Sequence, residues 1–321
     1  MKRKSYTFFI IIALIIILII SLLKQTLYKE PFTNNVKKFH HRLNSKRTIG
    51  KLAKQDSEYD ELKDVNPTET EGFSNKKKTS TKKNGLHVFH SIDVFDQGQS
   101  ETCTANAISS AMQVFLRNAK NYDIPSRAFI YSNAKYNDRH IWDCSTTGLN
   151  TDEAMNASNE YKVPNEHTWP FPSLQALENG DAGVLCNPLP QNLLIPPTKH
   201  IRYTELPRGT QQIRDAIDRG HPVLIDLLVY SSIDKADSDK KHLGYIPTPD
   251  FSKETYYGSH TMVIIGYNDA KQLLTLRNSW GKSLGDHTGN YTMSYSFIWD
   301  NKKDSYGDTP TTALWEVTQY S

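Results

Sequence analysis

The residues with the clearest chemical potential are Cys103, His260 and Asn278, which lie far apart in the sequence. A thiolate is a nucleophile, an imidazole can take and return its proton, and an amide can hold that imidazole in one tautomer. Gln97 lies six positions before Cys103 and could donate a hydrogen bond to an oxyanion. Together these groups could attack a carbonyl carbon, although Cys103 taken alone is more simply a buried cysteine of a core helix.

The segment after Cys103 has the pattern of an amphipathic helix. Its apolar residues recur at the spacing of one helix face: Ile108, Ala111, Met112, Phe115 and Ala119. Cys103 is therefore expected at a helix N-terminus. Unpaired backbone N–H groups and the positive end of the helix dipole would favour the thiolate there.

His260 and Asn278 lie in two strand-like segments on either side of the turn residues Asn268–Lys271. The sequence predicts an antiparallel hairpin with a three- or five-residue loop. If its register pairs Gly266 with Gln272, His260 and Asn278 face each other on one side of the sheet. The amide could then orient the imidazole toward Cys103.

These motifs, in this order, resemble the papain family of cysteine peptidases. The resemblance rests on the Gln, the Cys six positions later, the Gly-x-His segment before a Gly-Tyr strand, and Asn-Ser-Trp-Gly, and it extends from about Phe95 to Val317. The Cys-Thr-Ala-Asn-Ala sequence is similar to a bacterial and viral branch. The chain departs from the usual pattern at Ser100, Thr104 and Leu284, which replace a cysteine, an aromatic residue and a second tryptophan.

The resemblance implies an α+β fold of the papain type, with a helical subdomain, a β-sheet or barrel-like subdomain and an active-site cleft between them. It makes Cys103 the nucleophile, His260 the base and Asn278 its orienting group, and it implies that Gln97 and the Cys103 N–H stabilise the oxyanion. Gly148 would bind the extended substrate backbone, although a turn glycine explains it as well. The indole of Trp280 could shield the pair from water. No cofactor is implied.

The order of secondary structure also favours two packed subdomains. Helical patterns come first, at Pro125–Ser132 and Asn150–Tyr161, and strand patterns follow, at Val223–Tyr230 and Asn290–Tyr295. The segment 166–172 resembles a family motif that we interpret as packing. The three cysteines have no zinc-ligand spacing, so no metal site is predicted.

The N-terminus has the pattern of a membrane anchor. Residues 6–23 are almost uninterruptedly apolar after a basic start, and such a helix would reach about 27 Å, close to the thickness of a bilayer's hydrocarbon core. The alternative is a secretory signal peptide, which would have a shorter apolar core and a small-residue cleavage site. We therefore expect residues 1–23 to form a single-pass anchor, with the catalytic domain on the non-cytoplasmic side.

Residues 24–85 are polar and dense in charge, which is typical of a flexible stalk. The first 23 residues carry a charge of +3 and the stalk carries +7, so a total of +3 leaves the remainder at −7. An acidic remainder argues against a nucleic-acid partner. We assign residues 86–321 to the peptidase domain, with a helical half at 86–195 and a β half at 196–321.

The sequence thus predicts a membrane-anchored cysteine endopeptidase that acts on polypeptides. Two alternatives stay open: a catalytically silent binding module on the same fold, and an acyl or amide transferase with the same residues. If the domain lies outside the cytosol, Cys144 and Cys186 are expected to form a disulfide, in the half where relatives commonly place such bridges. Two unrelated thiols are the alternative.

Overall fold

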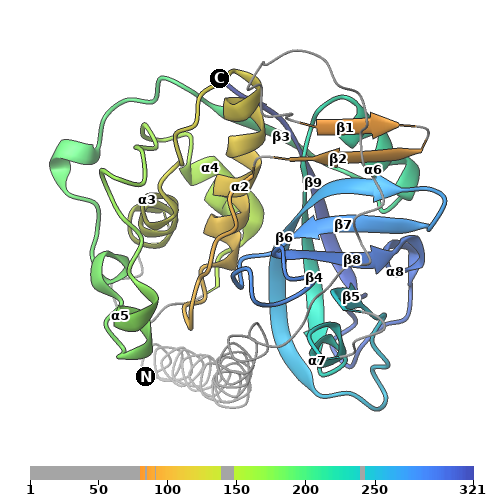
Figure 1. The fold of residues 1–321 in the computed structure, drawn as a ribbon. Coiled ribbons are helices and arrows are strands. Elements are labelled where there is room, and N and C mark those ends of the chain that lie inside the picture. The colour runs from red at the N-terminus through yellow and green to blue at the C-terminus, as the bar shows by residue number, and fades with distance from the viewer. Residues whose placement is uncertain (1–79, 84, 91, 139–147, 239–242) are drawn as a thin grey trace, which may run out of the picture.

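A helical half packs against one face of a large antiparallel sheet (Figure 1). The computed structural model describes residues 80–83, 85–90, 92–138, 148–238 and 243–321. Figure 1 shows α3, α4 and α5 on one side and most strands on the other, with α2 between the two groups. The predicted α+β arrangement of two packed halves is confirmed.

The helices are short apart from the one that begins at the cysteine. Their bounds are α2 Cys103–Asn118, α3 Arg127–Ser132, α4 Thr151–Ala157, α5 Leu174–Glu178, α6 Thr210–Asp218, α7 Ile233–Ala236 and α8 Tyr295–Trp299. One π-helical and two 3₁₀ segments add to them, η1 Asn133–Asp138, η2 Gly183–Cys186 and η3 Gln191–Leu193.

The described strands form one sheet in the order β3-β9-β4-β6-β7-β8-β5, with β2 also paired to β6 and β1 paired to β2. All of these pairs are antiparallel except that of β5 with β8. The bounds are β1 Ser80–Lys83, β2 Leu86–Phe89, β3 Ile201–Glu205, β4 Val223–Tyr230, β5 Tyr245–Ile246, β6 Tyr256–Asn268, β7 Leu273–Arg277, β8 Asn290–Ser294 and β9 Thr311–Tyr320.

Helix α2 is the centre of the molecule. Ala105, Ile108, Ala111 and Met112 have no exposed surface, and most of its polar residues are buried as well. The apolar pattern predicted one buried face, but α2 is covered on nearly every side because both halves pack on it. The start of this helix is thereby fixed at the boundary between the two halves.

Helix α4 ends earlier than the sequence predicts. It stops at Ala157, whereas the pattern suggested a helix to Tyr161. The side chain of Asn159 instead accepts a hydrogen bond from the Ile201 N–H at 2.7 Å and donates one to its carbonyl at 3.0 Å. An asparagine that satisfies a neighbouring strand in this way competes with continued helix.

The predicted register of the β6–β7 hairpin is wrong. The loop has four residues, Asp269 to Gln272, and a bulge lies between Ile264 and Gly266, so that Val263 pairs with Arg277 and Gly266 with Thr275. A bulge inserts an extra residue and bends its strand, which a simple alternation pattern does not reveal. His260 and Asn278 are hydrogen-bonded nevertheless, and Asn278 lies just beyond the end of β7 at Arg277.

The structure says little about the predicted N-terminal segments. Strand β1 falls inside the predicted stalk and pairs with β2, and the boundary at residue 86 stays a prediction. Residues 1–79 lie outside the described part, and so does the predicted anchor. In the part of the chain that the structure describes, no helix has the length and apolarity needed to cross a membrane.

Candidate active site

Cys103 is the first residue of α2, as predicted from the sequence. The turn before it is held by side chains. Asn106 Nδ2 donates to the Thr102 carbonyl at 2.8 Å and to its Oγ1 at 3.0 Å, and Ser100 Oγ lies 2.8 Å from the same Oγ1. Since these contacts fix the residue just before Cys103, the candidate nucleophile lies at a helix start that is held by side-chain hydrogen bonds.

His260 and Asn278 meet inside the sheet half, also as predicted. His260 Nε2 lies 2.8 Å from Asn278 Oδ1, and both side chains are buried. The indole of Trp280 stacks on the imidazole with a centroid separation of 4.7 Å and an interplanar angle of 29°, and only 1% of Trp280 is exposed. The aromatic cover excludes water from this side of the pair.

The backbone beside Asn278 determines the tautomer of His260. The Ser279 N–H donates to Asn278 Oδ1 at 2.7 Å, so this atom is the amide oxygen. His260 Nε2 must then carry a proton in order to donate to the same oxygen. The other ring nitrogen, Nδ1, is the one left to accept a proton, which is the arrangement of a general base.

Gln97 is held in an orientation suited to an oxyanion donor. Its Oε1 accepts a hydrogen bond from Ser279 Oγ at 2.6 Å, and its Nε2 donates to the Ser100 carbonyl at 2.7 Å. The Gln97 N–H also bonds the Ser279 carbonyl at 2.8 Å, which ties this loop to the Asn278 segment. One Nε2 hydrogen is left for a substrate oxygen.

The start of α2 lies against β6 next to His260. Thr104 Oγ1, one residue after Cys103, lies 3.1 Å from Thr261 Oγ1, one residue after His260. Burial raises the pKa of the Cys103 thiol, and hydrogen bonds from the Thr261 N–H and from Thr104 oppose that rise. The sulfur therefore lies beside the backbone that carries the base.

The charge state of the pair differs from the sequence expectation. The helix N-terminus was expected to favour the thiolate, but burial dominates and raises the pKa of Cys103. Burial also lowers the pKa of His260 to about 4, while its hydrogen bond to Asn278 acts in the opposite direction. Both groups are thus neutral before substrate binds, because a buried site disfavours either charge.

Gly148 lies near the nucleophile, but its predicted role stays a prediction. It is exposed, and a Cβ atom placed on it would meet no atom within 4 Å. Its N–H donates to Glu101 Oε2 at 3.1 Å, and Glu101 is two residues before Cys103. The open surface leaves room for a substrate backbone beside this loop.

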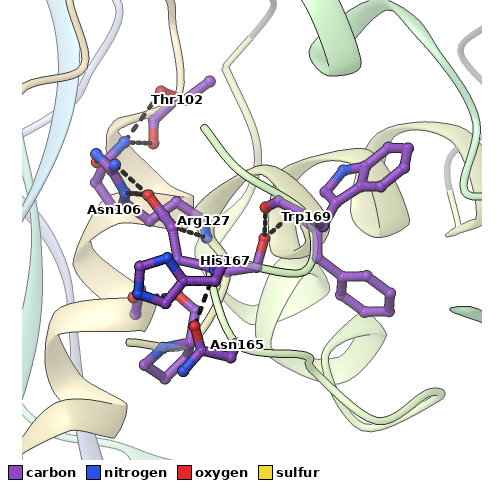
Figure 2. A network of polar contacts seen from close by, with 11 residues as sticks. Thr102, Asn106, Arg127, Asn165, His167 and Trp169 are labelled. Carbon is purple, nitrogen blue, oxygen red and sulfur yellow. Dashed lines mark hydrogen bonds and ion pairs between the residues drawn. The ribbon is translucent and has the colours of Figure 1, made fainter. Parts of the chain in front are cut away.

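An ion pair that the sequence did not reveal supports the start of α2 (Figure 2). Arg127 pairs with Glu166, donates to Asn106 Oδ1 at 3.1 Å and lies 4.2 Å from the ring centroids of both Phe95 and Phe171. Figure 2 shows Arg127 together with Asn106 and Thr102, beside the loop that carries Asn165, His167 and Trp169. The sequence predicted that this loop contributes to packing, and the loop does so through the partly buried ion pair of Glu166 with Arg127.

Comparisons with known proteins all find similarity to peptidases. A model of the Peptidase C39-like family matches residues 198–310, which include His260 and Asn278. A peptidase C1-like protein (L477) of Acanthamoeba polyphaga mimivirus is 25% identical over 219 residues, which is 65% of this chain and 66% of that protein, just under two thirds of its length.

Two solved structures share the fold. Xylellain, a cysteine protease from Xylella fastidiosa, superposes with a TM-score of 0.59 at 23% identity and covers 73% of this chain and 85% of its own. The clostridial cysteine protease Cwp84 has a TM-score of 0.51 at 16% identity, over 71% of this chain and 55% of its own. The chain has a papain-like fold and is similar to papain-like cysteine peptidases.

The departures from the usual papain-like motifs have structural roles here. Ser100, in place of a cysteine, donates to the Gln97 carbonyl at 2.6 Å. Thr104, in place of an aromatic residue, donates to the Leu149 carbonyl at 3.1 Å and contacts Thr261. Leu284, in place of a second tryptophan, is buried. None of the three replaces a catalytic group of the family.

The described residues of this papain-like chain hold no group of three or more His, Cys, Asp or Glu side chains that could bind a metal.

Three residues that support the candidate site were not identified from the sequence: Ser279, Arg127 and Glu166. Ser279 could have been found, since it lies inside the Asn-Ser-Trp-Gly motif. Nothing in the sequence pairs Arg127 with Glu166, because the two are 39 residues apart.

We expect the acid limb of the pH profile of kcat/KM to lie near pH 4. The base is active when neutral, and a pKa of about 4 for His260 keeps it neutral at all higher pH values. An unperturbed imidazole would instead place that limb near pH 6.5. The measurement is peptide hydrolysis from pH 3 to 9, and loss of activity already at pH 6 would contradict the buried, neutral state of His260.

Proposed function

We propose that this protein is a membrane-anchored endopeptidase that hydrolyses peptide bonds through Cys103, His260 and Asn278. The observation that carries the proposal is the geometry of His260. Its Nε2 donates a hydrogen bond to Asn278 Oδ1 at 2.8 Å, and the start of the Cys103 helix contacts Thr261, the residue after His260 on the same strand. The similarity to peptidases supports a polypeptide substrate, and this geometry supports the Cys-His-Asn mechanism.

The proposed reaction begins with proton transfer from Cys103 to Nδ1 of His260. The sulfur attacks the carbonyl carbon, and the resulting oxyanion receives hydrogen bonds from Gln97 Nε2 and from the Cys103 N–H. When the C–N bond breaks, His260 gives its proton to the leaving amine, which leaves a thioester on Cys103. His260 then takes a proton from water, whose oxygen attacks the thioester carbon; the C–S bond breaks to release the acid, and His260 returns its proton to the sulfur.

A transferase with the same residues is the second candidate function. It would form the same thioester and pass the acyl group to an amine in place of water. Product analysis separates the two, since a peptidase gives free acids and a transferase gives new amides when an amine is added. A silent binding module would show neither product, and an active-site epoxide would not label Cys103.

The direct experiment uses a library of peptides with the full chain and with its Cys103→Ala variant. The proposed function predicts cleavage of internal peptide bonds by the wild-type chain alone. Formation of new amides as the main product would favour the transferase. No turnover together with no epoxide labelling would contradict both enzymatic candidates.

We expect the full chain to stay with membranes through an alkaline carbonate wash, because residues 6–23 are apolar enough to span a bilayer. A chain that lacks residues 1–23 serves as the matched variant and should appear in the supernatant. Protease protection in sealed vesicles tests the proposed non-cytoplasmic side of the catalytic domain. Release of the full chain by carbonate would contradict the membrane anchor. Digestion of the catalytic domain from the cytosolic face would contradict its non-cytoplasmic location.

The predicted disulfide also stays a prediction. Cys144 lies outside the described residues, whereas Cys186 ends η2 in the helical half. A bridge between them would accord with a domain in an oxidising compartment.

A further inference from the structure

Asp226 is an acidic residue in the middle of β4 that the proposed mechanism does not use. Its Oδ1 accepts hydrogen bonds from Thr151 Oγ1 and Thr261 Oγ1, both at 2.6 Å. Its Oδ2 accepts one from the indole N–H of Trp315 at 3.0 Å. Three donors thus converge on one carboxylate, and such short charge-assisted bonds are strong and directional.

The partners of Asp226 come from both halves of the molecule. Thr151 is the first residue of α4 in the helical half, whereas Thr261 lies on β6 and Trp315 on β9 in the sheet half. Thr261 Oγ1 also lies 3.1 Å from Thr104 Oγ1 at the start of α2. The carboxylate is therefore the centre of a polar network across the boundary between the halves.

This network touches the residue after the nucleophile and the residue after the base. Thr104 follows Cys103, and Thr261 follows His260. A shift of α2 relative to β6 would have to break the contact between the two threonines or the hydrogen bond from Thr261 to Asp226. Misplacement of a reacting group by about 1 Å can lower turnover about 100-fold, so such a constraint has consequences for the rate.

The charge of Asp226 also acts on the nucleophile. Burial is the main factor that raises the pKa of Cys103, and the negative charge of Asp226 raises it further. Burial raises the pKa of Asp226 itself, while its three hydrogen bonds lower it. The other titratable groups near this pair are His260 on β6, Glu101 before α2 and Asp152 on α4.

We propose that Asp226 is a positioning residue: it holds α4 against β4 through Thr151 and fixes Thr261, which contacts Thr104 on α2, and so holds Cys103 in line with His260. This inference rests on the proposed function only for its kinetic part. The carboxylate contacts neither reacting atom in the described structure; it acts through the threonines and through its field at the sulfur.

The test separates position from charge with two variants. Thr261→Val removes the hydroxyl link and keeps the carboxylate. Asp226→Asn keeps the size of the side chain and removes its charge, but it would set an amide N–H against the indole N–H of Trp315. It is therefore combined with Trp315→Phe. The single variant Trp315→Phe is the reference for this double variant. Thr312→Val is the matched control, because Thr312 Oγ1 donates to the main-chain carbonyl of Asp226 and not to its carboxylate.

The readouts are kcat and KM for a peptide, and the pH dependence of Cys103 alkylation by iodoacetamide, which needs no turnover. We expect Thr261→Val to lower kcat about 10- to 100-fold with little change in KM and no shift of the alkylation profile. Asp226→Asn/Trp315→Phe should lower kcat similarly and should alkylate faster than Trp315→Phe near neutral pH, because loss of the negative charge lowers the pKa of the Cys103 thiol. Thr312→Val should stay within about twofold of the wild type in both.

Thermal melting of each variant separates these effects from unfolding. A wild-type kcat in both variants, or kcat losses that match the loss of folded protein, would overturn the positioning role. An unshifted alkylation profile in Asp226→Asn/Trp315→Phe would overturn the influence of its charge. If no variant and no wild-type chain cleaves peptides but the alkylation profiles shift as expected, the peptidase assignment fails while the role of Asp226 at the thiol stands.

Discussion

Replacement of Cys103 by alanine is expected to abolish peptide hydrolysis, with a loss in kcat on the order of 10⁴ or more. The variant lacks the only atom in the described site that can form the thioester. His260→Ala should be nearly as severe, because desolvation raises the pKa of the Cys103 thiol, which then needs a base to become nucleophilic. Both losses are measured as initial rates on one peptide at pH 7.

Cys186→Ala is the matched control for Cys103→Ala, since Cys186 lies in η2 and outside the catalytic residues. It should hydrolyse the peptide at close to the wild-type rate per folded molecule. Labelling by an active-site epoxide should disappear in Cys103→Ala and persist in Cys186→Ala. Full activity of Cys103→Ala would exclude the proposed mechanism.

Gln97→Ala is expected to lower kcat about 100-fold with a smaller effect on KM, which is the scale of one oxyanion-hole donor. The reason is geometric, since the Gln97 amide is held by Ser279 Oγ and by the Ser100 carbonyl with one N–H left for the developing charge. Circular dichroism and melting of the variant would establish that the loop is still folded.

Ser279→Ala tests how much of the effect of Gln97 depends on the orientation of its side-chain amide. It leaves the donor in place but removes the 2.6 Å bond that orients it, so a loss of about tenfold or less is expected for one hydrogen bond. If Ser279→Ala were as severe as Gln97→Ala, orientation would account for the whole effect. An unchanged kcat in Gln97→Ala would show that the oxyanion is stabilised by other donors.

The chemical groups of the site were predictable from the sequence because each belongs to a short local motif. Cys103 opens a helix with an evident apolar pattern, and His260 and Asn278 occur in strand-like segments around a turn. The pairing of Gln97 with the Asn-Ser-Trp-Gly segment was not predictable in detail, although both were named. It depends on a backbone contact between Gln97 and Ser279, which are 182 residues apart.

The errors have the same origin. The hairpin register was wrong because a bulge between Ile264 and Gly266 leaves no mark on an alternating apolar pattern. Helix α4 ended early because Asn159 bonds Ile201 on a distant strand. The thiolate was expected from the unpaired N–H groups and the dipole of the helix start, whereas the burial that raises the pKa of Cys103 depends on the tertiary structure.

The sequence by itself determined which residues are the candidates for the chemistry and which local elements hold them, since helix starts, strands and turns follow from the side chains of neighbouring residues. Only the tertiary structure decided the tautomer of His260, the neutral state of the Cys103 and His260 pair, and the place of Asp226 between the halves. Hydrogen-bond partners and burial depend on residues brought together from distant parts of the chain, and their energies are set by the low dielectric of the packed interior. No local pattern records them.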